Sequence, residues 1–203
     1  RIKEVDPSIF VISGAPASTA VDAPGVAISD IRYYNAMFSY QDGVIRNYLD
    51  ALGVHPDGSA NPPESYPGET PSPAQGWTDH PTFYFRRIED IRALMVEYGM
   101  ERTPVWITEF GWNTSQVACD PGSGQWQGGV SEQAQAEHLT QALRILESDP
   151  YVEVAIWYAL RNNVWSATPD DPAEPEANFG LVRTDFAPKP AFYAFKDYAN
   201  PAP

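Results

Sequence analysis

Residues 103–114, TPVWITEFGWNT, decide the fold of this chain. The apolar run from Val105 to Phe110 is short, follows a proline and ends at a glycine, which predicts a buried β-strand. Its carboxyl end holds a carboxylate, Glu109. Because a buried charge is costly unless it is paired or does chemistry, Glu109 is either a functional residue or a salt-bridged residue at a strand end. Alternation along the strand predicts that Val105, Ile107 and Glu109 face a barrel interior, with Trp106 packed outward beneath helices.

On both sides of this strand in the sequence, apolar runs alternate with helical patterns. Residues 9–12, 51–54 and 152–160 read as further strands, whereas helical spacing marks residues 28–50, 88–98, the segment after Ser131 and the segment from Pro190. Without a repeat or a linker, this order predicts one α/β domain over residues 1–203, with parallel strands and right-handed crossovers.

The long loops all follow strands and precede helices, which is typical of a (β/α) barrel that builds its active site from those loops. A doubly wound sheet is the alternative. That fold binds phosphate at a glycine-rich turn after the first strand, and residues 13–19, SGAPAST, lack the G-x-G-x-x-G pattern.

Composition excludes several classes of function. The 203 residues carry a formal net charge of −14, which repels phosphate backbones and anionic lipid, so we expect neither nucleic acid nor a membrane as partner. No apolar run approaches the length of a membrane span, and residues 1–10 lack the pattern of a signal peptide. The three histidines lie on different predicted elements without an H-E-x-x-H motif, which argues against a zinc hydrolase. We expect no metal and no cofactor. The acidic run DDPAEPEAN, residues 170–178, is either a solvated loop or a calcium ligand set, and the solvated loop is favoured.

The motif in residues 103–114 is one of four segments that resemble a known protein family. Together with DALGVHPDG (50–58), VEVAIWYALRN (152–162) and LVRTDFAPKPAFYAFKDY (181–198), it resembles the carboxyl-terminal half of a clan A retaining glycoside hydrolase, near the cellulase and β-xylosidase-like families. The resemblance covers nearly the whole chain. It implies a TIM barrel, hydrolysis of β-linked sugars, and the role of catalytic nucleophile for Glu109 at the end of the seventh strand.

A retaining glycosidase needs a second carboxyl group as acid/base. In the clan this is the Glu of an Asn-Glu-Pro motif after the fourth strand. Residues 2–14, IKEVDPSIFVISG, resemble the fourth helix end and the fifth strand, so we expect strands five to eight, a half-barrel whose acid/base is not present in this chain. The Glu174-Pro175 pair lies after the last strand without a preceding Asn and does not take that role.

The resemblance also implies substrate-binding residues. His55 stands where the family contacts the substrate or the nucleophile, and Trp157 where it has an aromatic floor under the sugar; a loop histidine and a core tryptophan are the alternatives. Trp112 and Asn162 lie just past strand ends and are candidates to line the cleft. Asp57 replaces a tyrosine that often follows the histidine, and an anionic neighbour would weaken the nucleophile. The loop residues Trp77, Trp126 and Trp165 either stack on sugars or anchor their own loops.

Two hypotheses about function remain open. The first is a retaining glycosidase acting on an oligo- or polysaccharide, with an extracellular or periplasmic location. The second is a non-catalytic carbohydrate-binding or interaction module derived from such a barrel. Because four strands alone leave two exposed edges, we expect either a homodimer or a partner that supplies the amino-terminal half-barrel.

Overall fold

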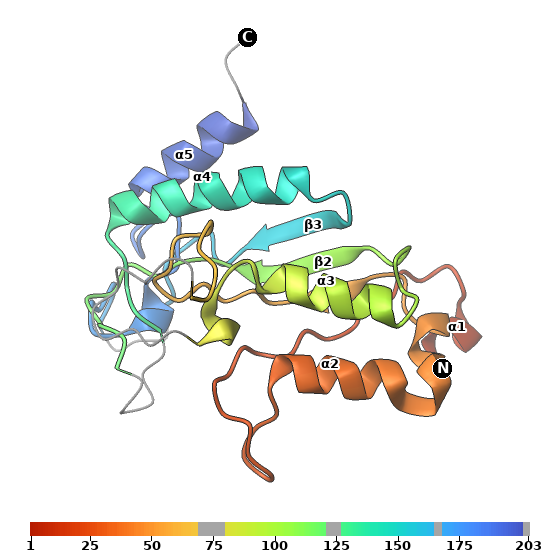
Figure 1. Cartoon of the computed structure of the whole chain (residues 1–203). Coiled ribbons are helices and arrows are strands. Elements are labelled where there is room, and N and C mark those ends of the chain that lie inside the picture. The colour runs from red at the N-terminus through yellow and green to blue at the C-terminus, as the bar shows by residue number, and fades with distance from the viewer. Residues whose placement is uncertain (69–79, 121–126, 165–167, 201–203) are drawn as a thin grey trace.

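The computed structural model describes residues 1–68, 80–120, 127–164 and 168–200. Its centre is a parallel sheet of three strands in the order β1 (Leu52–Val54), β2 (Val105–Phe110) and β3 (Val152–Trp157) (Figure 1). Helix α3 (Arg87–Glu97) connects β1 to β2, and helix α4 (Glu132–Ser148) connects β2 to β3. This mixed α/β arrangement is compatible with part of a (β/α) barrel.

The first predicted strand forms only in part. Residues 9–12 run beside β1, but a single parallel bridge joins Ile12 to Ala51. The backbone N–H of Val11 donates to the Asp50 carboxylate at 2.7 Å instead of to a neighbouring strand. Ile9 and Phe10 are exposed. The predicted strand over residues 9–12 is therefore only partly formed, because the Asp50 side chain takes a backbone group that a ladder would use.

The helices follow their sequence signals. Helix α4 begins after Ser131, whose hydroxyl accepts from the N–H of Ala134 at 3.0 Å, and α3 is followed by Gly99 with φ +70°. Between residues 28 and 50 the predicted helix is split, since Gln41, Asp42 and Gly43 have positive φ. It becomes α2 (Asp30–Ser39) and the 3₁₀ segment η1 (Tyr40–Asn47). The remaining described elements are α1 (Ile2–Val5), η2 (Pro81–Phe83), η4 (Pro175–Ala177) and α5 (Pro190–Ala199).

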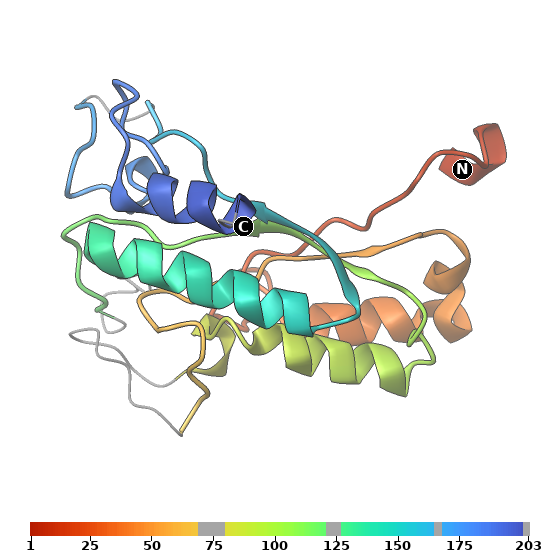
Figure 2. The same cartoon turned by 90° about the horizontal axis from the view of Figure 1, so that it is seen from above.

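The main hydrophobic core lies between the sheet and the helices on one side of it (Figure 2). Val105 and Ile107 are completely buried there, against Ile88, Ile91 and Met95 of α3 and Leu146 of α4. This corrects the facing predicted for β2, because Val105 and Ile107 pack beneath the helices and do not fill a barrel interior.

The opposite face of the sheet is the open one. Trp106 lies on this face, where its ring stacks on Phe10 with centroids 5.1 Å apart and its indole N–H donates to Glu153 at 3.3 Å. The expectation that Trp106 packs outward beneath the helices is therefore also wrong. Within the described ranges, no helix combines the length and the apolar character needed to cross a bilayer.

A bulge at the end of β2 explains how Glu109 leaves the core side of its strand. Ile107 pairs with Ala155 and Phe110 pairs with Trp157, so Thr108 and Glu109 together stand opposite Ile156 alone. One extra residue in β2 breaks the alternation. As a result Thr108 is partly exposed, Glu109 is exposed, and Phe110 returns to the buried side.

Candidate active site

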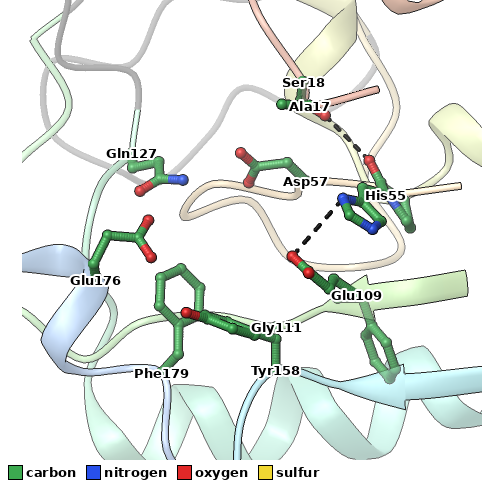
Figure 3. A pocket seen from close by; sticks show the side chains of 12 residues that line it. Ala17, Ser18, His55, Asp57, Glu109, Gly111, Gln127, Tyr158, Glu176 and Phe179 are labelled. Atoms are coloured by element: carbon green, nitrogen blue, oxygen red, sulfur yellow. Dashed lines mark hydrogen bonds and ion pairs between the residues drawn. The ribbon is translucent and has the colours of Figure 1, made fainter. Parts of the chain in front are cut away.

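The carboxyl ends of the three strands surround a cavity of about 410 Å³. His55 follows β1, Glu109 lies near the end of β2, and Tyr158 follows β3, so all three strands contribute to its wall (Figure 3). Residues from the first loop, Ala17 and Ser18, close one side. A cavity at the carboxyl ends of parallel strands is where a (β/α) barrel builds its active site.

His55 and Glu109 form the charged centre of the cavity. The Nδ1 atom of His55 lies 3.8 Å from a carboxylate oxygen of Glu109 (Figure 3). On the other side of the ring, Nε2 lies 2.8 Å from the hydroxyl of Thr108. Burial lowers the pKa of His55, although the Glu109 charge opposes that shift. The neutral imidazole is therefore favoured near pH 7.

Two further carboxylates line the cavity, Asp57 next to His55 and Glu176 across the cavity from it (Figure 3). Asp57 lies on the loop after β1 and Glu176 on the loop after β3, with Gln127 of the loop after β2 between them (Figure 3). The Gln127 side chain hydrogen-bonds both carboxylates. Burial raises the pKa of Asp57, and burial together with the Asp57 charge raises the pKa of Glu176. Gln127 thus links three loops while the two acids retain protons more readily than in water.

Aromatic rings form the floor beneath these polar groups. Tyr158 and Phe179 line the cavity and pack edge to face, with ring centroids 5.4 Å apart (Figure 3). The floor requires close contact between the ends of β2 and β3. A Cβ atom on Gly111 would lie 2.4 Å from the carbonyl oxygen of Tyr158, so this position admits only glycine without rearrangement.

Three of the five predicted site residues lie outside this cavity. Trp112 is buried among Phe85, His138 and Trp157, and its indole N–H donates to the carbonyl of Asn61 at 2.9 Å. Trp157 packs edge to face on Phe110 on the helix side of β3. Buried Asn162 donates to the Asp170 carboxylate at 2.7 Å and accepts from the N–H of Gly180 at 2.8 Å.

These placements differ from the sequence-based expectation for a physical reason. Trp157 ends β3 on its buried face, so the next residue, Tyr158, reaches the cavity in its place. Asn162 secures the loop of residues 170–180 and does not face the cleft. In the acidic run, Asp170 accepts from Asn162 and Thr184, and Glu176 lines the cavity.

Sequence reasoning did not assign Gln127, Tyr158, Glu176 and Phe179 to the site. Adjacency was the available signal for Tyr158, since it follows the predicted floor residue directly. Gln127 and Glu176 belong to loops without a periodic pattern, so nothing local predicts where their side chains point. The loop residues Trp77, Trp126 and Trp165 lie outside the described part of the chain.

Comparisons with known proteins found glycoside hydrolases. Residues 83–172 match the model of a glycosyl hydrolase catalytic core. A family 39 glycoside hydrolase from the gut symbiont Bacteroides cellulosilyticus WH2 is 26% identical, with a TM-score of 0.58 over 94% of this chain and 33% of that one. A monomeric β-xylosidase from Caulobacter crescentus CB15 is 18% identical, with a TM-score of 0.55 over 98% of this chain and 35% of that one. The comparison with curated proteins gave no match.

The resemblance to a clan A glycoside hydrolase is thereby confirmed. The matched family model covers α3, β2, α4 and β3, and includes both Glu109 and Tyr158. The chain spans about a third of the length of the two solved structures that it resembles.

Proposed function

We propose that this chain carries the nucleophile of a retaining β-glycosidase and corresponds to strands five to eight of its barrel. The observation that carries the proposal is the position of Glu109 at the carboxyl end of a central parallel strand, in a cavity and 3.8 Å from His55. The match to a glycosyl hydrolase catalytic core supports it. An oligo- or polysaccharide with β-linked sugars is the proposed substrate.

In the proposed first step, a carboxylate oxygen of Glu109 forms a bond to the anomeric carbon while the bond to the leaving oxygen breaks. The leaving oxygen takes the electron pair and needs a proton unless it is a stable anion. In the second step water attacks the anomeric carbon, gives a proton to the acid/base, which now acts as the base, and the bond to Glu109 breaks to release its carboxylate. Tyr158 and Phe179 provide an apolar floor on which a sugar ring can pack.

The proton donor of the intact site is proposed to come from an Asn-Glu-Pro motif, which residues 1–203 do not contain. Glu176 is the alternative within the described residues, because it lines the cavity and its pKa is raised. A probe with a good leaving group separates the nucleophile from the donor, since a dinitrophenolate departs without protonation.

The test uses a dinitrophenyl β-glycoside, fluorinated beside the anomeric carbon, in xylose and glucose configurations. We expect mass spectrometry to find one covalent sugar on the peptide that contains Glu109. Glu109→Gln should abolish the adduct. Glu176→Gln is the matched control and should retain it, because the probe needs no acid.

Two outcomes would contradict the proposal. An adduct that survives Glu109→Gln, or that lies on another residue, removes the assignment of the nucleophile. Binding of xylo- or gluco-oligosaccharides without any adduct would instead favour the alternative, a non-catalytic carbohydrate-binding module. Loss of the adduct in Glu176→Gln as well would mean that Glu176 takes part in the first step.

A further inference from the structure

The bulge in β2 directs two consecutive side chains toward one imidazole ring. Thr108 reaches Nε2 of His55 at 2.8 Å, and Glu109 reaches Nδ1 at 3.8 Å. In a regular strand neighbouring side chains point to opposite faces, so this convergence depends on the extra residue opposite Ile156. The two contacts occupy both nitrogen atoms of the ring.

The two contacts determine the proton on each nitrogen. A neutral imidazole has one N–H and one lone pair. If Nε2 carried the hydrogen, the lone pair of Nδ1 would face the negative oxygen of Glu109, which is repulsive. If Nδ1 carries the hydrogen, it points toward the carboxylate, and Nε2 accepts from the hydroxyl of Thr108. Only the second arrangement makes both contacts attractive.

We propose that Thr108 is a positioning residue, whose hydroxyl donates to Nε2 of His55 and holds the ring in the tautomer with Nδ1–H directed at the Glu109 carboxylate. The proposal rests on the proposed role of Glu109 as nucleophile. The oxygen that His55 approaches would be held at a fixed angle before the sugar arrives. At 3.8 Å the Nδ1 contact is longer than a hydrogen bond, and contacts of this kind tighten when substrate binds.

The surroundings of His55 favour a neutral ring, for which the tautomer matters. Burial of the ring lowers its pKa, and Glu109 is the charged group that opposes this. Asp57 and Glu176, the other acids that line the same cavity, both have a raised pKa, so they retain protons more readily and add less negative charge near the ring. The backbone of His55 is also held, because the hydroxyl of Ser18 donates to its carbonyl at 3.2 Å (Figure 3). With the backbone fixed, the Thr108 hydroxyl at Nε2 determines the orientation of the imidazole ring.

The first measurement is ¹⁵N NMR of the imidazole in the unmodified chain, assigned by the loss of its signals in His55→Gln. We expect a protonated Nδ1 and an unprotonated Nε2 near neutral pH. Thr108→Val has almost the same shape and keeps a strand-forming side chain, but it has no donor, so the ring should shift toward the other tautomer. Thr108→Ser retains the hydroxyl and should restore the wild-type pattern.

The second measurement is the rate at which the fluorinated probe labels Glu109. Thr108→Val should slow labelling roughly tenfold, the value of one lost hydrogen bond, and Thr108→Ser should recover most of that rate. A purely structural role for Thr108 would alter folding stability in both variants without a change of tautomer.

The outcomes separate this proposal from the proposed function. A protonated Nε2 in the unmodified chain, or a tautomer that is the same in Thr108→Val, overturns the role of Thr108 whatever the labelling shows. If the tautomer is as expected but no variant labels at Glu109, the proposed function fails and Thr108 still orients the ring.

Discussion

At the scale of single residues, Asp57 is a carboxyl group whose negative charge the fold disfavours. Burial raises its pKa, although the N–H of Ser59 donates to it at 2.7 Å and Gln127 also hydrogen-bonds it. In the unfolded chain the same carboxyl group ionises near its ordinary pKa of about 3.9. The folded state therefore binds the proton more tightly, and above the folded-state pKa the charge destabilises it.

We predict that Asp57→Asn raises the free energy of unfolding at about pH 7 by on the order of 1 kcal/mol. The gain should shrink as the pH falls through the folded-state pKa and vanish below about 3.9, where both states are protonated. Urea unfolding followed by tryptophan fluorescence measures it. Asp185→Asn is the matched control, since exposed Asp185 accepts from Ala187 in the same type of turn. Equal stabilisation at every pH would contradict the prediction.

Single residues also show the limits of what the sequence could predict. Glu109 and His55 were predictable as neighbours, because the carboxyl ends of adjacent parallel strands meet at one edge of a sheet. Thr108 and Tyr158 were not. The approach of Thr108 and Glu109 to one ring depends on a bulge that strict alternation does not predict, since alternation places Glu109 on the buried face. The access of Tyr158 to the cavity depends on where β3 ends.

At the scale of elements, one ion pair links α2 to α3. The guanidinium of Arg87 contacts the Asp30 carboxylate through two nitrogens, at 2.8 and 2.9 Å, and Asp30 is only 4% exposed. Replacing Asp30 by Asn leaves the mostly buried guanidinium of Arg87 without its buried carboxylate partner. We predict a loss of about 3–5 kcal/mol in the free energy of unfolding.

The control for this prediction lies on the same arginine. Asp90 contacts Arg87 at 3.0 Å, yet its side chain is 59% exposed, so Asp90→Asn should cost at most about 1 kcal/mol. Chemical unfolding of both variants at one pH decides the matter. If the two losses are similar, burial of the Asp30–Arg87 pair does not increase its contribution to the free energy of unfolding.

The sequence predicted element boundaries correctly where a local capping signal marks them. The Ser131 cap and Gly99 placed α4 and the end of α3 correctly, since both act through backbone hydrogen bonds within the element. Residues 9–12 are as apolar as a strand, but their pairing depends on the Asp50 carboxylate, which accepts from the N–H of Val11 across 39 positions of sequence. Such a contact is set by the tertiary structure and leaves no trace in a local pattern.

At the scale of the whole molecule, the sheet has an exposed apolar face and an unpaired edge within the described residues. Ile156 on β3 is 49% exposed and Phe10 is 51% exposed, both on the side away from the helices. Strand β3 pairs only with β2 among the described strands. An edge and an apolar face of this kind favour pairing with another chain.

We predict that the chain of residues 1–203 self-associates, and more tightly as salt rises, because a net charge of −14 per copy opposes contact until it is screened. Light scattering from low salt to about 0.5 M measures this. Ile156→Lys should weaken association by placing a charge on the open face. Val96→Lys changes the same charge on the outer helix α3, where Val96 is 52% exposed, and should leave association unchanged. A monomer at every salt concentration, or equal effects of the two lysines, would mean that this face is not where copies of the chain meet.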